Sequence, residues 1–455
     1  MGKRVGMKLA LHALIAVLCI LPLQAQRRKV VMISIDGLRG TELASVSGLN
    51  WNLPNLTEIV ARGAVSEGMI GILPTVTAPS TASIVTGVSP SVHGIPTNFL
   101  FDPEHTMTAD DSGNEYAELI HVPTLWTLAH QAGLRTASAY WPTTIGAPID
   151  ADFPNHAPMK NERDRMLFRA ISTPGLVAEY EKKYGELPIG TRAFDDHVVT
   201  QMALLLLQSR KPDFLLVYFQ DFDHAEHKYG PDSPEAIRTL QSIDADIGII
   251  RKAIAAAGLE KQTDIVIVSD HGFLPLRQSF HPNAVLASLN LLGRKGHPEE
   301  WRVTSFGGGG SFGLVVHDPN DHAAIALATK AFQKLQQQGC CGIEHIFDRQ
   351  QLKAAKGYAT SFLAIGLKLG FSAEGGDDGP WITPSQGRGA HGYPPGLKNM
   401  DAAFAAVGPG IPHLRLPRAH IVDVAPTVAA LLGLRMANVE GTNILPTVGN
   451  TQLAQ

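Results

Sequence analysis

Residues 29–35 read KVVMISI, and Asp36 and Gly37 follow directly. A nearly unbroken run of apolar and β-branched residues is typical of a strand buried on both faces, as in a parallel sheet. The same signature recurs at residues 213–219 (DFLLVYF), 263–270 (TDIVIVSD) and, less strongly, 400–410 (MDAAFAAVGPG). Helical patterns lie at residues 122–133, 233–258 and 420–434. Strands that alternate with helices predict an α/β sandwich with a central, mainly parallel sheet flanked by helices.

The bulk composition is that of a globular protein with a large core. The chain has 455 residues, of which 44% are hydrophobic and 18% are charged. This length fits one large α/β domain with insertions or two ordinary domains. The formal net charge of −4 and the lack of a basic run give no reason to expect nucleic acid as a partner.

Changes in residue composition along the chain predict how it is divided into segments. Residues 1–25 read as a secretory signal peptide, with positive charge, an apolar stretch and a cleavage point at Ala25. We therefore expect an exported protein, periplasmic or secreted, with no stable membrane anchor after cleavage. Residues 28–274 and 390–440 read as two parts of the α/β core, residues 275–389 as an inserted cap with flexible loops, and residues 441–455 as a tail. The glycine-rich run at 306–313 lacks the Lys-Ser/Thr ending of a phosphate loop.

Two adjacent cysteines, Cys340 and Cys341, remain once the signal is removed. A disulfide prefers Cα atoms about 4.4–6.8 Å apart, which neighbouring residues rarely achieve. We therefore expect no disulfide framework, and a role of this pair as metal ligands is the alternative.

Acidic and imidazole side chains follow the predicted strands where each one ends. In open α/β sheets, ligands bind beyond the carboxyl ends of the strands, so these residues should meet at one edge. Each alone could be a turn or loop residue, but together they form an oxygen and nitrogen ligand set that suits zinc. Six such residues are too many for one tetrahedral ion and predict two ions, as in sites for phosphoryl displacement. The set comprises Asp36, Asp223, His227, Asp270, His271 and His391.

The stretch 74–87, PTVTAPSTASIVTG, crowds hydroxyl groups at the predicted start of a helix. Ser and Thr there commonly cap the helix. The helix N-terminus could also receive phosphate oxygens, and a metal could activate one alcohol as a nucleophile. The hydroxyl residues are Thr75, Thr77, Ser80, Thr81, Ser83 and Thr86.

The ordered motifs closely resemble the nucleotide pyrophosphatase/phosphodiesterase family of the alkaline phosphatase superfamily. The resemblance spans roughly residues 30–434 and is weakest in the insertion. The motifs that carry it are VVMISIDGLR, PTVTAPSTASIVTGVSPSVHGI, DFDHAEHKYGP, VSDHGF and AHGYPP.

The resemblance implies zinc-dependent hydrolysis of phosphodiester or pyrophosphate bonds in a small molecule, with nucleotides among the candidate substrates. It makes Thr77 the nucleophile, which forms a phosphothreonine that water then hydrolyses, with the N–H of Ala78 as an oxyanion donor. Thr75 and Thr81 are expected to be structural. Of the two implied Zn²⁺ ions, one would take Thr77, Asp36, Asp270 and His271, and the other Asp223, His227 and His391.

Two positions depart from the family pattern. Ala78 stands where the family has an aromatic residue that stacks on a nucleobase, while Tyr218 resembles the partner aromatic. Ser80 stands where the resemblance implies an Asn that donates to a phosphate oxygen, and a hydroxyl can still donate. Phe99 and Trp141 are expected in the core, with a remodelled pocket as the alternative.

Three other functions remain open from the sequence. A phosphomonoesterase of the same superfamily would need Arg or Lys to grip a dianionic phosphate, and Arg39 and Arg388 are the candidates. A sulfatase would need Cys or Ser in place of Thr77 and normally Arg in place of Thr81. A non-catalytic binding protein would be expected to have lost the nucleophile or a ligand, whereas all seven positions here hold a competent residue.

Overall fold

The computed structural model describes residues 28–104, 106–107, 113–156, 158–190, 194–293 and 297–446. The predicted signal peptide and most of the predicted tail lie outside these residues. Within the described residues, no helix combines the length and the apolar character that crossing a bilayer requires.

A mixed sheet of eight strands forms the centre of the molecule, in the order β18-β2-β17-β7-β1-β6-β4-β5. Strand β1 pairs in parallel with both neighbours, so that Ile33 lies opposite Val217 on one side and Ile267 on the other. Strand β17 runs antiparallel to β7 and β2. The predicted mainly parallel α/β sheet is therefore confirmed. Its strands are β1 (Lys29–Ile35), β2 (Ala64–Ser66), β4 (Thr136–Ala139), β5 (Ala151–Phe153), β6 (Phe214–Phe219), β7 (Thr263–Val268), β17 (Phe404–Val407) and β18 (Leu414–Leu416).

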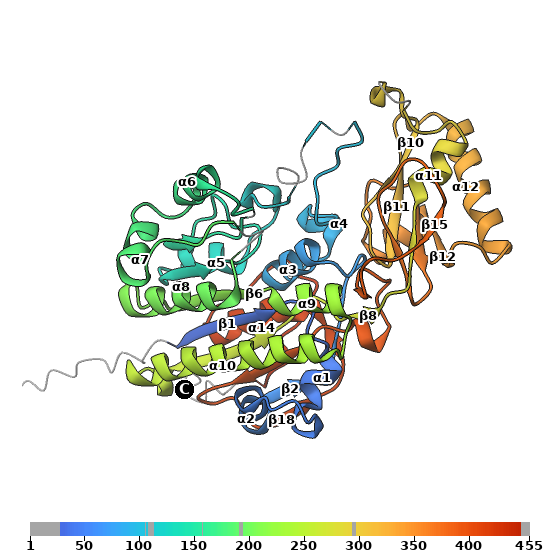
Figure 1. Ribbon diagram of the computed structural model, residues 1–455. Helices are drawn as coiled ribbons and strands as arrows, with labels where there is room; N and C mark the ends of the chain where they lie inside the picture. The colour runs from blue at the N-terminus through green and yellow to red at the C-terminus, as the bar shows by residue number, and fades with distance from the viewer. Residues whose placement is uncertain are drawn as a thin grey trace, which may run out of the picture.

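Side chains of β1 alternate between two hydrophobic cores. Val31 and Ile33 belong to one core, and Val30 and Met32 to the other. Helices cover both faces of the sheet (Figure 1). Because both faces are buried, the sequence of β1 does not alternate between apolar and polar residues. The first core packs under α2 (Pro54–Arg62), α6 (Glu162–Ile171), α7 (Leu176–Tyr184), α8 (Asp196–Ser209) and α10 (Pro234–Ala256). The second packs under α3 (Thr77–Thr86), α5 (Leu125–Gln131) and α14 (Val424–Leu431).

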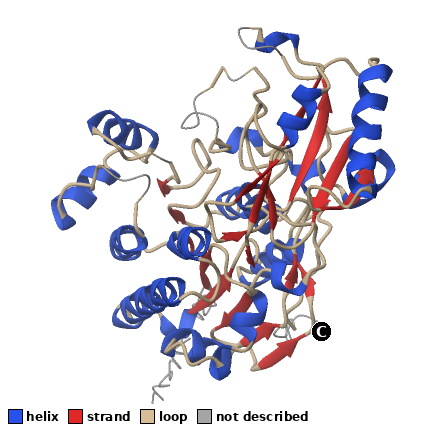
Figure 2. Cartoon of the chain, turned by 45° about the vertical axis from the view of Figure 1, so that its right-hand side comes forward, coloured by secondary structure: helices blue, strands red, loops and turns tan. Residues whose placement is uncertain are grey.

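The region expected to be an insertion with flexible loops contains a regular sheet of its own. Four antiparallel strands in the order β10-β11-β13-β12 pack with helices around a separate cluster that includes Phe312, Phe332 and Ile365 (Figure 2). Glycines inside these strands, such as Gly313 and Gly366, weaken the strand pattern in the sequence. The elements are β9 (Gln278–Phe280), α11 (Pro282–Ser288), β10 (Val303–Phe306), β11 (Ser311–Val316), α12 (His322–Gln337), β12 (Ile343–Asp348), α13 (Arg349–Ala355), β13 (Leu363–Leu367), β14 (Phe371–Ala373) and β15 (Ile382–Pro384).

Short elements complete the described chain and connect the core to the insertion. They are α1 (Gly40–Ala44), β3 (Met69–Ile70), α4 (Pro90–His93), α9 (Asp221–Tyr229), β8 (Leu274–Pro275), β16 (Gly389–Ala390) and β19 (Ala419–His420).

The structure pairs Cys340 with Cys341, so the argument from spacing against a bond between these two neighbours is wrong. Their Cα atoms lie 3.8 Å apart, the spacing of any two neighbours across a trans peptide. Cys341 adopts a left-handed conformation with φ of +66°. The chain thus turns at Cys341 and Gly342, which also has a positive φ, a backbone feature that cysteine spacing alone did not reveal.

Replacing Ile33 by Ala should lower the free energy of unfolding by about 2–5 kcal/mol, because it leaves a cavity at the centre of the sheet. Ile33 is fully buried, whereas Ile249 on α10 is 37% exposed. Urea denaturation followed by circular dichroism should show a lower midpoint for Ile33→Ala and little change for Ile249→Ala. Equal midpoints for the two variants would contradict the described packing.

Candidate metal centre and active site

Three adjacent strands deliver the candidate site residues to one edge of the sheet. Asp36 follows β1, and Asp270 and His271 follow β7. Helix α9 starts just after β6 and carries Asp223 and His227 on one face. These strands are parallel neighbours, so their carboxyl ends meet, as the sequence predicted.

The first group of side chains contains Asp36, Asp270 and His271, all buried, with ligand atoms within 4.8 Å of one another. The Nε2 atom of His271 lies 3.3 Å from Oδ1 of Asp36 and 3.5 Å from Oδ2 of Asp270. The hydroxyl of Thr77 lies 3.4 Å from the same Nε2 atom. Thr77 therefore sits beside this group, where the resemblance had implied it.

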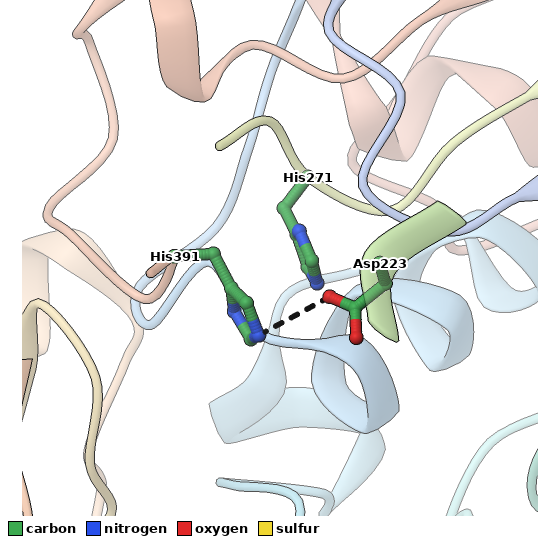
Figure 3. A group of neighbouring side chains, drawn as sticks. All are labelled: Asp223, His271 and His391. Atoms are coloured by element: carbon green, nitrogen blue, oxygen red, sulfur yellow. Dashed lines mark ion pairs between the residues drawn. The ribbon is translucent and has the colours of Figure 1, made fainter. Parts of the chain in front are cut away.

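The second group centres on Asp223. Oδ1 of this carboxylate lies 3.5 Å from Nε2 of His227 and 3.7 Å from Nε2 of His391. Figure 3 shows Asp223 facing His391 and His271, whose rings stack with their centroids 3.7 Å apart. His271 also lies with Asp223 and His391 in a cluster whose ligand atoms are within 4.8 Å of one another. His227 contacts this cluster through Asp223, and Thr77 lies beside His271, so the seven predicted ligand residues are neighbours.

All three histidines use Nδ1 toward the backbone and turn Nε2 toward the carboxylates. Nδ1 of His227 lies 3.1 Å from the carbonyl oxygen of Gly389. Nδ1 of His271 lies 3.2 Å from that of Gly272, and Nδ1 of His391 lies 3.2 Å from that of Thr75. An Nδ1–H that donates to a carbonyl fixes the tautomer and leaves the Nε2 lone pair for a metal.

The carboxylates lack the partners that buried charges need. Oδ1 of Asp36, Oδ1 of Asp223 and Oδ2 of Asp270 are buried without a hydrogen bond. Burial, together with the charges of Asp223 and Asp270, raises the pKa of Asp36 well above its usual range. Within the described residues, no Lys or Arg forms an ion pair with these three aspartates. Because uncompensated buried carboxylates are costly, the donor set fits bound cations with nitrogen and oxygen ligands.

Tyr218 contacts the first group of side chains through Asp36. Its hydroxyl donates a short hydrogen bond to Oδ2 of Asp36, and its ring packs edge-on against Trp141 with centroids 6.1 Å apart. Tyr218 is only 2% exposed, and Trp141 is fully buried in the core. A buried ring offers no free face to a nucleobase, so this placement gives no support to the expected stacking role of Tyr218.

The backbone around Thr77 holds a contact that the sequence did not reveal. Thr77 begins α3, and the N–H of the next residue, Ala78, donates to Oδ1 of Asn98 at 2.8 Å. The expected oxyanion donor is therefore already engaged, and Asn98 lies against the nucleophile segment. Asn98 sits in a loop, in a stretch without periodicity or a motif, so no local pattern singled it out.

Other hydroxyls of this segment have structural partners. Thr75 donates to the carbonyl of Tyr393 at 2.7 Å, and Thr81 to that of Thr77 at 2.9 Å, as the expectation of structural roles requires. The hydroxyl of Ser80 is fully buried without a hydrogen bond. A substrate contact of Ser80 stays a prediction.

Removing the hydroxyl of Tyr218 should weaken metal binding by about 10–100-fold, because Asp36 loses the donor that orients it. The measurement is the zinc dissociation constant of Tyr218→Phe by competition with a chromophoric chelator. Tyr140→Phe is the matched control, since Tyr140 is equally buried and donates to the carbonyl of His156, in the core away from the site. Similar affinities in both variants would remove this role from Tyr218.

Comparison with known proteins places the chain in a family. The model of the type I phosphodiesterase / nucleotide pyrophosphatase family matches residues 30–394. Human ectonucleotide pyrophosphatase/phosphodiesterase family member 1 is 23% identical over 431 residues, which cover 91% of this chain and 41% of the relative. An uncharacterised pyrophosphatase/phosphodiesterase of Schizosaccharomyces pombe is 28% identical over 61% of this chain and 51% of its own. The chain thus spans about half or less of the length of these curated relatives.

Solved structures share the fold. Human ectonucleotide pyrophosphatase/phosphodiesterase 5 superposes with a TM-score of 0.68 at 18% identity, covering 92% of this chain and all of its own. An inactive form of the murine protein, in complex with AMP, gives a TM-score of 0.66 at 17% identity. With the family model matching most of its length, the chain belongs to the nucleotide pyrophosphatase/phosphodiesterase family of the alkaline phosphatase superfamily.

Proposed function

We propose that this protein is an exported, metal-dependent hydrolase that cleaves phosphodiester or pyrophosphate bonds with Thr77 as nucleophile. The observation that carries the proposal is the position of the Thr77 hydroxyl, 3.4 Å from Nε2 of His271 and so beside the group of Asp36, Asp270 and His271. The signal-like residues 1–25 support export.

Asp36, Asp270 and His271 would hold one zinc ion together with Thr77, and Asp223, His227 and His391 would hold the other. Bound zinc would supply Lewis acidity, which lowers the pKa of the Thr77 hydroxyl and offsets the charge on phosphate oxygens. The unpaired carboxylate oxygens and the oriented Nε2 atoms support this assignment.

Thr77 lies at the first residue of α3, so its oxygen stands where the N-terminus of that helix favours a negative charge. Its oxygen would attack phosphorus as the bond to the leaving oxygen breaks, which gives a phosphothreonine and a free alcohol or phosphate. Water would then attack the same phosphorus from the opposite side, release the product and restore Thr77.

Asn98 is the best-placed side-chain donor for a phosphate oxygen. Its Oδ1 atom accepts from the N–H of Ala78, which fixes the amide beside Thr77. The opposite end of the amide carries the NH₂ group, which would donate to the phosphate in place of the backbone N–H that the resemblance implied.

The surroundings favour a diester over a monoester. A dianionic phosphate is usually gripped by Arg or Lys. Arg39 is 8% exposed and is committed to Glu42 and Asp232, so it is not free to bind substrate. Arg388 is exposed and contacts His227 through its backbone N–H, and it does not line the cavity that opens beside His227 and His391.

Nucleotides are a substrate class that family membership supports. Ala78 is buried in a small aliphatic cluster with Ala82 and Ile95, so this position cannot stack on a base. We therefore propose a small-molecule phosphodiester as the substrate, with a nucleotide held by contacts other than stacking at residue 78.

Substituting Thr77 by Ala should lower turnover of p-nitrophenyl thymidine 5′-monophosphate by about 10³-fold or more, because the covalent step is lost. Hydrolysis is followed by release of p-nitrophenolate from zinc-loaded protein, with bis-p-nitrophenyl phosphate and p-nitrophenyl phosphate alongside. We expect the diesters to react faster than the monoester.

Thr86→Ala is the matched control, since Thr86 lies on the same helix, is buried, and donates to the carbonyl of Ala82 at 2.7 Å. It should retain activity. Turnover that survives in Thr77→Ala would exclude Thr77 as nucleophile, and a faster monoester would move the protein to the phosphomonoesterase alternative.

Asn98→Ala should lower kcat by about 10²-fold through loss of an oxyanion donor. Asn98→Asp separates two roles, because it keeps an acceptor for the N–H of Ala78 but puts negative charge where the amide would donate. If Asn98 donates to phosphate, the Asp variant is at least as impaired as the Ala variant. Near-normal kcat in Asn98→Asp would limit Asn98 to holding the backbone of Ala78.

A further inference from the structure

A cavity of about 420 Å³ opens directly beside His227 and His391. Its walls come from two parts of the chain that are distant in sequence. Val76 and Phe99 belong to the core, while the glycine run 307–309 and the segment 372–375 belong to the insertion. The cavity therefore lies where the insertion meets the candidate metal centre.

The lining of this cavity is mostly apolar or small, with Thr97, Asn98 and Ser372 as its neutral polar side chains. Val76, Phe99 and Leu276 supply apolar side chains, and the described lining residues include no Lys or Arg. Besides the two histidines, Glu374 is the titratable group among them. Away from the candidate metal ion at His227 and His391, a phosphate chain placed here would meet one carboxylate and no Lys or Arg, which is unfavourable for a charged group leaving water.

The glycine-rich run at 306–313 uses backbone donors for contacts within the protein. The N–H of Gly309 donates to the carbonyl of Ala373 at 3.1 Å, and that of Gly310 to the carbonyl of His391 at 2.7 Å. A Cβ atom on Gly309 would lie 2.5 Å from the carbonyl oxygen of His391. The glycines thus allow the insertion to lie closely over the metal-site loop, and two of their donors are already used.

A loop from the core crosses to the insertion and carries Phe99 with it. Phe101 packs edge-on against Phe306 and Trp301 of the insertion, with centroids 5.0 and 5.8 Å apart. Two residues earlier, Phe99 remains 53% exposed at the cavity. The aromatic contact of Phe101 therefore holds an exposed apolar ring at the cavity wall.

The geometry of in-line displacement indicates whether the leaving group or the retained group of a diester lies in this cavity. The attacking and leaving oxygens lie on opposite sides of phosphorus. Thr77 stands beside the group that contains Asp36 and Asp270, so the leaving oxygen would point toward the group around Asp223. The cavity is lined by His227 and His391 of that second group.

We propose that this cavity is the leaving-group subsite and that it accepts an uncharged organic group with apolar surface in preference to a phosphate chain. This inference rests on the proposed function. The Thr77 hydroxyl gives its proton to water as its oxygen attacks phosphorus, and the bond to the leaving oxygen breaks. The leaving oxygen takes a proton from water and departs as an alcohol or phenol. Diesters of aryl or alkyl alcohols are then better substrates than nucleoside triphosphates.

Two esters with the same retained half test the subsite. p-Nitrophenyl thymidine 5′-monophosphate and thymidine 5′-triphosphate both leave the thymidylyl group on Thr77, and they release p-nitrophenol and pyrophosphate. We expect a higher kcat/KM for the aryl ester, and a shift of the ratio toward the triphosphate by about fivefold in Phe99→Lys, which places a cation at the cavity. The intrinsic reactivity of each ester is unchanged between variants, so the shift reports the subsite.

Phe99→Leu is the control, because it keeps an apolar side chain at the same exposed position, and its ratio should match that of the wild type. A binding measurement adds a readout without turnover. In zinc-loaded Thr77→Ala, calorimetric titration should show that the nitrophenyl group strengthens binding relative to thymidine 5′-monophosphate and that the extra diphosphate does not.

The outcomes separate the two proposals. If both esters are cleaved but the triphosphate is preferred, or if Phe99→Lys leaves the ratio unchanged, the subsite inference is overturned while the diesterase remains. If neither ester is cleaved by zinc-loaded wild type, the proposed function itself fails, and the inference fails with it.

Discussion

Three carboxylates buried at one edge of a sheet are the constraint on which the rest of the structure depends. Asp36, Asp223 and Asp270 are at most 6% exposed, and each keeps a buried oxygen without a hydrogen bond. Such groups oppose folding unless protons or cations compensate them. These carboxylates therefore destabilise the folded chain at the carboxyl edge of β1, β6 and β7. Bound metal would offset this unfavourable electrostatic free energy. Metal binding and stability are then linked, because a cation that binds only the folded chain stabilises it.

The geometry of this edge follows from the register of the buried strands. β1 is held between two parallel neighbours, and its side chains alternate between two cores. A shift by one residue would exchange the side chains of β1 between the two cores, so the close packing of side chains of different size in each core fixes where the strand ends. Just past that end, Gly37 has φ of +80°, and its N–H donates to Asp270 at 3.2 Å. The strand register thus sets the position of Asp36 relative to the residues of β7.

This dependence explains what could be predicted from the sequence and what could not. The end of a buried strand can be predicted from the local sequence, and the carboxyl ends of parallel strands lie at one edge of the sheet. Asp36, Asp223 and His271 could therefore be assigned to one site from their positions after apolar runs. The hydrogen bond from the N–H of Ala78 to Asn98 and the burial of Tyr218 arise from tertiary packing, which the periodicity of apolar residues in the sequence does not encode. The sheet of the insertion was missed because glycines interrupt its strands. The pairing of Cys340 with Cys341 depends on a left-handed turn at Cys341.

His391 connects the metal centre to the insertion. The chain returns from the insertion immediately before His391, whose ring lines the cavity and whose carbonyl accepts from Gly310 at 2.7 Å. A metal-site side chain and a wall of the candidate leaving-group subsite are therefore parts of the same hydrogen-bonded unit. Movement of the glycine-rich run would disturb this hydrogen bond, so the bond links the position of the insertion to that of the backbone of His391. A Cβ atom would lie 2.5 Å from the carbonyl oxygen of His391 at Gly309 and 2.2 Å from the ring of Tyr393 at Gly310, so glycine at these two positions allows the insertion to lie against the segment that carries His391.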